Sequence, residues 1–112
     1  MDLYGQVGRI RMLNGTVALN VTTATAIRCG SSELIDRKWL YIMNASGVNI
    51  FIGSEYLDTD GAPQTITKDK LARTGIKMAS GDAIWLPVSD KLTVYGISQS
   101  GAGKRLRIME IA

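Results

Sequence analysis

The residue types that do most enzyme chemistry are scarce in this 112-residue sequence, which has no histidine and one cysteine, Cys29. Histidine is the usual base of Ser-His-Asp and Cys-His catalysis and a common metal ligand, so its absence excludes those mechanisms. Cys29 would need another activating group, and its neighbours Arg28 and Glu33 offer only a modest shift of the thiol pKa. We therefore expect Cys29 to be a buried or tolerated thiol, and the chain to have no catalytic, cofactor-binding or metal-binding residues.

Two loops come near to ligand-binding motifs without completing them. A Gly-Lys pair could end a phosphate-binding loop, but that motif needs glycine where the chain has Ser98 and serine or threonine where it has Arg105. Residues 58–61, Asp-Thr-Asp-Gly, would lie inside a calcium loop whose twelfth position is Thr67, where such loops need a bidentate glutamate. We expect neither loop to bind its ligand.

The charge balance is mildly basic, with 13 Lys and Arg residues against 10 Asp and Glu residues and a net charge of +3. Most basic residues are scattered, and only Lys104, Arg105 and Arg107 cluster. We expect these three on the solvent face of an edge strand, where charge discourages aggregation, and we expect no specific binding of nucleic acid.

The length and composition predict one folded domain with a single core, because 46% of the residues are hydrophobic and 21% are charged. One cysteine cannot form an internal disulfide, and no run of about 18 apolar residues could span a membrane. The N-terminus also lacks the apolar core of a signal peptide. We therefore expect the chain to fold inside the cell and to have no membrane partner.

Short segments of alternating polarity predict an all-β fold with little helix. In residues 16–22 the apolar side chains Val17, Leu19 and Val21 share one face, which is typical of a half-buried strand. Residues 68–72 could add one helical turn.

The most apolar segment is residues 37–43, Arg-Lys-Trp-Leu-Tyr-Ile-Met, and its unbroken apolar run indicates a strand covered on both faces. Residues 44–47 supply turn chemistry and residues 48–52 resume as a strand, so we expect a β-hairpin. Trp39 and Trp85 both lie within apolar strands, so we expect both in the core. That placement leaves too few aromatic side chains for a sugar-binding or base-binding platform.

The last third of the chain predicts three further strands. Residues 83–88 contain Pro87, which cannot donate a ladder hydrogen bond and belongs at an edge or a strand end. Strands follow over residues 92–97 and 104–111, joined by a flexible connection. In the final strand, one face has Leu106, Ile108 and, less regularly, Glu110, and the other has Arg105, Arg107, Met109 and Ile111.

About seven or eight strands, joined mainly by hairpins, predict an all-β fold, a compact antiparallel β-sandwich over residues 14–112. A jelly-roll-like topology is favoured over an immunoglobulin-like one, because the Cys-Trp-Cys spacing is absent and the strand number is even or nearly so.

Residues 37–53 and 75–112, about half of the chain, resemble small virion proteins of tailed bacteriophages. The shared features are a large apolar strand before Asn-Ala-Ser-Gly, an Ile-Phe-Ile-Gly strand, a Ser-Gly-Asp turn and a last strand that ends in Glu-Ile-Ala. The resemblance implies a β-sandwich of the capsid decoration, or cement, type, bound to the major capsid protein or another virion protein. It also implies a place on the capsid surface of a virion made in the bacterial host cytoplasm.

Residues 1–13 mix apolar side chains with glycine and arginine and are poorly patterned for an internal strand. We predict either an arm that adds to a neighbouring subunit or the first edge strand of this domain. The candidate partner-contact residues are Leu3, Tyr4, Val7, Arg9, Ile10, Arg11 and Tyr56.

The sequence leaves two functions open. One is a structural virion protein that bridges capsid subunits as a homo-oligomer, a dimer or a trimer. The other is a phage tail or fibre module that binds a host-surface glycan or protein through the loops over residues 55–63 and 98–103. An enzyme is not expected.

Overall fold

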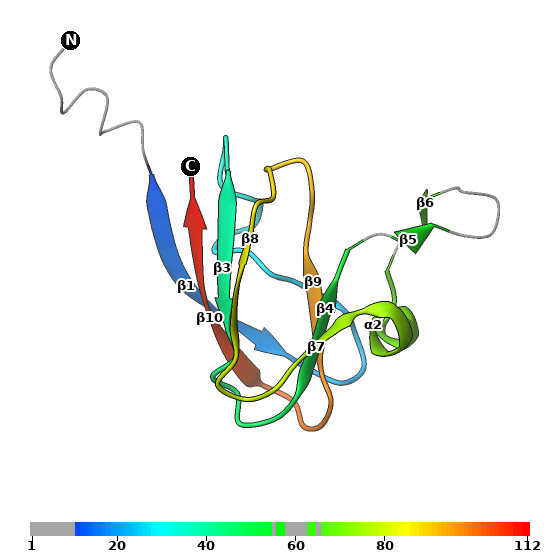
Figure 1. Cartoon of the computed structure of the whole chain (residues 1–112). Helices are drawn as coiled ribbons and strands as arrows, with labels where there is room; N and C mark the ends of the chain where they lie inside the picture. The colour runs from blue at the N-terminus through cyan, green and yellow to red at the C-terminus, as the bar shows by residue number, and fades with distance from the viewer. Residues whose placement is uncertain (1–10, 55, 58–62, 65) are drawn as a thin grey trace, which may run out of the picture.

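The computed structural model describes residues 11–54, 56–57, 63–64 and 66–112, and the fold is mostly β (Figure 1). Sheet A contains, in spatial order, β1 (Met12–Leu19), β10 (Lys104–Ile111), β3 (Trp39–Met43) and β8 (Ala83–Leu86). Sheet B contains β2 (Thr25–Ala26), β9 (Tyr95–Ser98), β4 (Ile50–Gly53) and β7 (Ile76–Met78). A small hairpin of β5 (Tyr56–Leu57) and β6 (Pro63–Gln64) and the helix α2 (Lys68–Thr74) complete the described elements. All strand pairs are antiparallel.

The core lies between the two sheets, because alternate residues of each strand point toward the other sheet. Leu19, Leu40 and Leu106 of sheet A are fully buried, and they belong to one cluster with Ile50 and Ile52 of sheet B. Each such side chain contributes roughly 1.5–3 kcal/mol by leaving water. The predicted antiparallel sandwich is therefore confirmed in outline, and so is the inward placement of Val17 and Leu19.

The predicted hairpin over residues 37–53 is wrong, and so is the expectation that hairpins join most strands. β3 belongs to sheet A and β4 to sheet B, so the chain crosses between the sheets at Asn44. Asn44 is fully buried, and its Nδ2 donates to the carbonyls of Val48 at 2.8 Å and Met78 at 3.0 Å. A turn sequence specifies a change of direction, whereas the sheet that the next strand joins depends on distant partners.

The placement of the basic cluster on an edge strand is also wrong. β10 lies between β1 and β3, with Arg107 opposite Thr16 on one side and Met43 on the other. The arginines nevertheless point to solvent, because they lie on the face of the strand opposite the core. Edge positions in sheet A belong to β1 and to β8, whose pairing ends just before Pro87 as expected.

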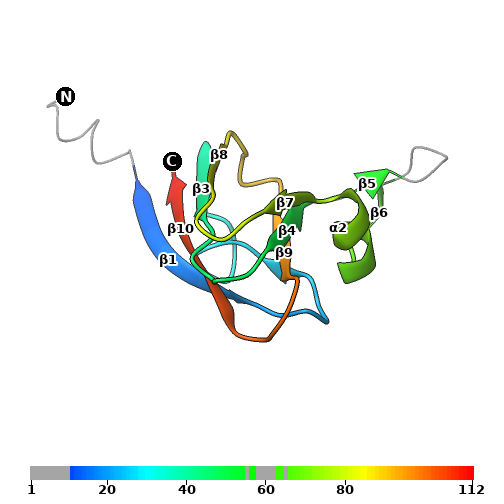
Figure 2. The ribbon, with the colours of Figure 1, turned by 60° about the horizontal axis from the view of Figure 1, so that its bottom comes forward.

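Helix α2 confirms the predicted helical turn and extends it to Thr74. Thr67 caps its N-terminus by accepting a hydrogen bond from the backbone N–H of Lys70. Leu71 is fully buried against Ile97 and Phe51, which lie on the side of sheet B away from the core. The helix therefore covers the outer side of sheet B, as the two ribbon views agree (Figures 1 and 2).

Candidate functional site

The outer face of sheet A is the side turned away from the core, and no described helix or strand covers it. Residues that stand opposite one another in antiparallel strands share a face, so the strand registers define its members. They are Met12, Asn14, Thr16 and Ala18 of β1, Arg105, Arg107, Met109 and Ile111 of β10, Trp39, Tyr41 and Met43 of β3, and Ala83 and Trp85 of β8. We call this set the outer face.

Three aromatic side chains of the outer face form a half-exposed cluster. Trp39 is 42% exposed and Trp85 is 51% exposed. The rings of Trp39 and Trp85 meet edge to face with centroids 6.3 Å apart, and those of Tyr41 and Trp85 lie 4.7 Å apart. Such ring pairs hold large apolar surfaces in fixed orientation.

The prediction that Trp39 and Trp85 belong to the core is therefore wrong. Leu40 and Ile42 point inward and are fully buried, while the aromatic residues between and before them point outward. An unbroken apolar run shows that both faces of a strand are apolar, but it does not show that a second layer covers both. Here the second layer is missing among the described residues.

A shallow groove of about 560 Å³ lies beside the aromatic cluster. Its lining includes Asn14 and Thr16 of β1, Arg107 and Met109 of β10, and Tyr41 and Met43 of β3. One wall is therefore polar, the opposite wall is apolar, and Arg107 lies between them. The outer face as defined contains two arginines and no carboxylate.

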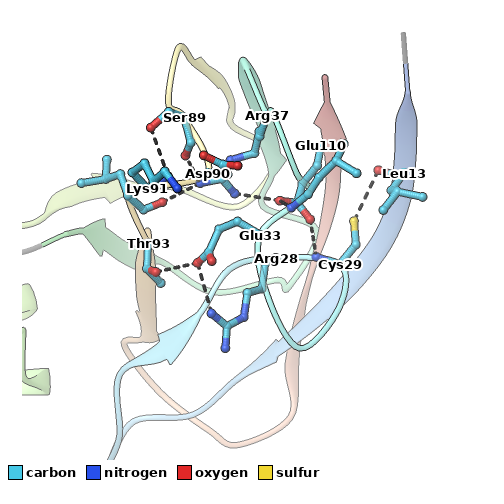
Figure 3. Close-up of polar contacts among 12 residues, drawn as sticks. Leu13, Arg28, Cys29, Glu33, Arg37, Ser89, Asp90, Lys91, Thr93 and Glu110 are labelled. Atoms are coloured by element: carbon cyan, nitrogen blue, oxygen red, sulfur yellow. Dashed lines mark hydrogen bonds and ion pairs between the residues drawn. The ribbon is translucent and has the colours of Figure 1, made fainter. Parts of the chain in front are cut away.

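A second polar arrangement, on the inner side of sheet A, centres on the fully buried Glu110 (Figure 3). Its Oε2 accepts from Arg37 Nη1 at 2.8 Å and from the backbone N–H of Leu34 at 3.1 Å. Its Oε1 accepts from the backbone N–H of Cys29 at 2.8 Å. One carboxylate thus fastens three residues of the loop between β2 and β3 to the strand β10.

Arg37 extends the same network to the loop between β8 and β9. Its Nη2 donates to the carbonyls of Ser89 at 2.9 Å and Leu92 at 2.6 Å. The preceding residue, Asp36, has a positive φ of 61°, and its backbone N–H donates to Asp90 Oδ2 at 2.9 Å. This turn directs the Arg37 side chain inward, so the ion pair is a structural clamp closed on all sides by protein.

Cys29 lies at the rim of this clamp and is held as a thiol. Burial and the nearby carboxylate of Glu110 raise its pKa to about 11, and its Sγ donates to the Leu13 carbonyl at 3.3 Å. Arg28 is turned away from the sulfur and pairs with Glu33 at 3.1 Å. At neutral pH this geometry supports no nucleophile, since the thiolate is the reactive form.

Of the candidate contact residues, Leu3, Tyr4, Val7, Arg9 and Ile10 lie outside the described residues. Arg11 precedes β1, and its Nη2 donates to the carbonyl of Ile35 at 2.9 Å. Tyr56 lies in β5, away from both sheets. Arg11 is not among the residues that line the groove.

The sequence-based prediction did not include the aromatic cluster or the groove, although the residue pattern of one strand indicated an outward-facing apolar surface. The alternation in β10 puts Met109 and Ile111 on the same face as Arg105 and Arg107. Arginine side chains are mostly exposed to water in proteins, so the methionine and isoleucine on the same face had to point outward as well.

Comparisons with known proteins add no relative: no protein-family model matches the chain, and no curated protein resembles it. Within residues 11–54, 56–57, 63–64 and 66–112, no three His, Cys, Asp or Glu side chains are grouped so that they could hold a metal ion. No helix in that part of the chain has the length and apolar character needed to cross a membrane.

Proposed function

We propose that the protein is a structural component of a bacteriophage particle, a decoration protein that binds the capsid surface through the outer face of sheet A and bridges neighbouring subunits. The observation that carries the proposal is the uncovered aromatic cluster of Trp39, Tyr41 and Trp85. Exposed apolar surface of this kind marks protein contact sites, and Trp, Tyr, Met and Arg are the residues enriched in them. The proposal assigns the chain no catalytic activity.

The contrast with sheet B supports this assignment. The outer side of sheet B holds Phe51 and Ile97, and helix α2 covers them within the same molecule. The equivalent side of sheet A has larger aromatic residues and no described cover. Covering it with a second protein would bury Trp39 and Trp85 at the same time.

The strand order supports a finer proposal about the fold, namely a jelly roll. With the β5–β6 hairpin set aside and the eight remaining strands numbered consecutively, the two sheets have the orders 1-8-3-6 and 2-7-4-5. Strands that alternate between two four-stranded sheets in this way form the paired Greek keys of jelly rolls, which occur in viral capsid proteins and in lectins. The topology alone does not distinguish those two roles.

The test uses capsids assembled from the major capsid protein encoded in the same phage genome. The wild-type chain is expected to sediment with the capsids at a fixed ratio and to raise their thermal transition in calorimetry. The paired substitution Trp39→Ala and Trp85→Ala should weaken capsid binding by at least about 30-fold, the effect of losing an interface hot spot. Ile76→Ala is the matched control, because Ile76 is 59% exposed but lies on β7 of sheet B. Absence of wild-type binding, or equal binding by the double variant, would contradict the proposal.

A second candidate, a tail or fibre module that binds a host-surface glycan, is favoured by the groove. Tyr41 offers an aromatic ring, while Asn14, Thr16 and Arg107 offer hydrogen-bonding groups on the other wall. A glycan array, followed by titration of tryptophan fluorescence with the glycans that bind, tests this function. Saturable glycan binding that Arg107→Ala abolishes, together with no capsid binding, would replace the first proposal with the second.

A further inference from the structure

No described strand pairs with the side of β1 that faces away from β10, and this open edge exposes a row of backbone groups. Arg11 and Ala112 exchange both of their backbone hydrogen bonds, at 3.1 Å and 2.8 Å. In an antiparallel pair such closely bonded pairs alternate along the strand, so Leu13, Gly15 and Val17 also turn their N–H and C=O toward β10. The backbone groups of the four alternate residues point away from β10, toward the open edge: Met12, Asn14, Thr16 and Ala18.

β1 also lacks the features that prevent edge strands from pairing with strands of other molecules. Its eight residues, Met-Leu-Asn-Gly-Thr-Val-Ala-Leu, include no charged side chain and no proline. Each of the other edges is short or interrupted: β8 has four residues and is followed by Pro87, β7 has three and contains Lys77, and β2 has two. Among the described strands, β1 is thus the long edge without protection, and pairing with another strand would satisfy it.

The sequence of β1 is complementary to itself when two copies run antiparallel about Gly15. In that register Leu13 lies opposite Val17 of the second copy, and Asn14 lies opposite Thr16 of the second copy. Met12 lies opposite Ala18 of the second copy, so apolar residues meet apolar residues and polar residues meet polar residues. The register also joins residues whose backbone groups face the open edge. Moving the centre to Asn14 or to Thr16 places Leu13 opposite a glycine or Gly15 opposite Val17.

We propose that β1 pairs with β1 of a second copy of this chain, antiparallel about Gly15, so that two copies share one continuous eight-stranded sheet. Leu13 supports a second copy as the occupant: it points to the inner side of sheet A yet is 45% exposed, and Val17 of the second copy covers it. The pairing sets two outer faces side by side in one surface with two-fold symmetry. It goes beyond the proposed function and holds whichever partner the outer face binds.

Disulfide cross-linking tests the register. In the Cys29→Ser background, Asn14→Cys and Thr16→Cys proteins are prepared separately, mixed and oxidised. Residues opposite each other in neighbouring strands lie within reach of a disulfide, so the mixture should give a cross-linked dimer that contains one of each. Each protein alone should cross-link far less. Self-linking of the Asn14→Cys protein or of the Thr16→Cys protein, equal to that of the mixture, would overturn the register about Gly15.

Sedimentation equilibrium of the full chain tests the dimer itself. A pair of single strands forms a small interface, so we expect a dissociation constant on the order of micromolar. Asn14→Lys combined with Thr16→Lys places ammonium groups opposite each other across the pair and should leave only monomer. The control, Asn14→Ala combined with Thr16→Ala, keeps the backbone pairing and should stay dimeric.

The same measurement distinguishes the other occupants. A full chain that is monomeric at all concentrations, or a lysine variant that dimerises as the wild type does, would overturn the proposal. A full chain that stays monomeric while a chain without residues 1–10 dimerises would overturn the proposal too. That result would assign the open edge of β1 to the N-terminal segment of the same chain.

Discussion

The two faces of sheet A both depart from the usual distribution of apolar residues inside and charged residues outside, and they do so in opposite ways. On the inner side, Arg37 and Glu110 place a full positive and a full negative charge where no water reaches. On the outer side, Trp39 and Trp85 place the largest apolar side chains in contact with water. Strand β10 contributes to both, since Glu110 points inward between Met109 and Ile111, which point outward.

Alternation along a strand assigns side chains to the two faces of a sheet, but it does not decide which face is shielded from water. The loop over residues 27–38 and the loop over residues 87–94 close over Glu110, and backbone groups of the first satisfy its oxygens. No described element closes over the outer face. Burial is decided by the loops and the second layer, and most of these segments lie tens of residues from β10 in the sequence.

Breaking the buried ion pair of Arg37 and Glu110 should reduce stability more than any other change. Glu110→Gln leaves the guanidinium of Arg37 buried without a counter-charge, and we expect it to reduce the free energy of unfolding by about 3–5 kcal/mol. Combining it with Arg37→Met should recover part of that loss, because no net charge then remains in the interior. Urea denaturation measures both. A loss below about 1 kcal/mol in the single variant would show that the pair is not a clamp.

The next effect concerns the thiol beside the clamp. Because the pKa of Cys29 is raised from 9.0 to about 11, the folded protein at pH 8 should react with a disulfide reagent about 100-fold more slowly than the unfolded protein. Because the pKa of Cys29 is higher in the folded protein than in the unfolded one, stability should fall as pH rises from 9 toward 11, where only the unfolded thiol ionises. Equal rates in buffer and in urea would show that Cys29 is accessible and ionised.

A smaller change in stability is expected from a substitution on the outer face of sheet A. Trp85→Ala should lower the free energy of unfolding by about 1 kcal/mol or less, although it removes a tryptophan, because half of that side chain is already in water. Leu40→Ala, on the same sheet but fully buried, should cost about 2–5 kcal/mol. If the tryptophan substitution cost as much as the leucine substitution, the outer face would be part of the core.

The smallest effect is the pH dependence due to Glu33. Burial acts to raise the pKa of Glu33, but hydrogen bonds from the Thr93 hydroxyl and from Arg28 outweigh it and lower the pKa below 4.5. The ionised carboxylate therefore stabilises the fold above pH 4.5, and this contribution is lost as pH falls through the lowered pKa. Glu33→Gln should make the acid limb of a stability–pH curve shallower. A curve identical to that of the wild type would show that Glu33 does not contribute to the pH dependence of stability.

Local features of the fold were predictable from the sequence, and the pairing was not. The bounds of the last strand, the shared face of Leu106, Ile108 and Glu110, and the helical turn near Leu71 all follow from patterns within a few residues. The partner strands of β3 and β4 depend on segments tens of residues away, and so the predicted hairpin failed. The prediction that Trp39 and Trp85 belong to the core was wrong for the same reason. Whether these side chains are exposed depends on a covering layer that the local sequence does not encode.

The position of β10 between β1 and β3 has a consequence for the order in which the protein can assemble during translation. β1 and β3 are made early, yet each pairs with β10, and β10 is made only after the 60 residues 44–103 have followed β3. Until then β1 has no partner strand in sheet A, and β3 can pair only with β8. Folding must therefore wait for a late, long-range closure, which is slow compared with local pairing. A nascent chain stalled before residue 104 is the form of this protein that is most in need of a chaperone.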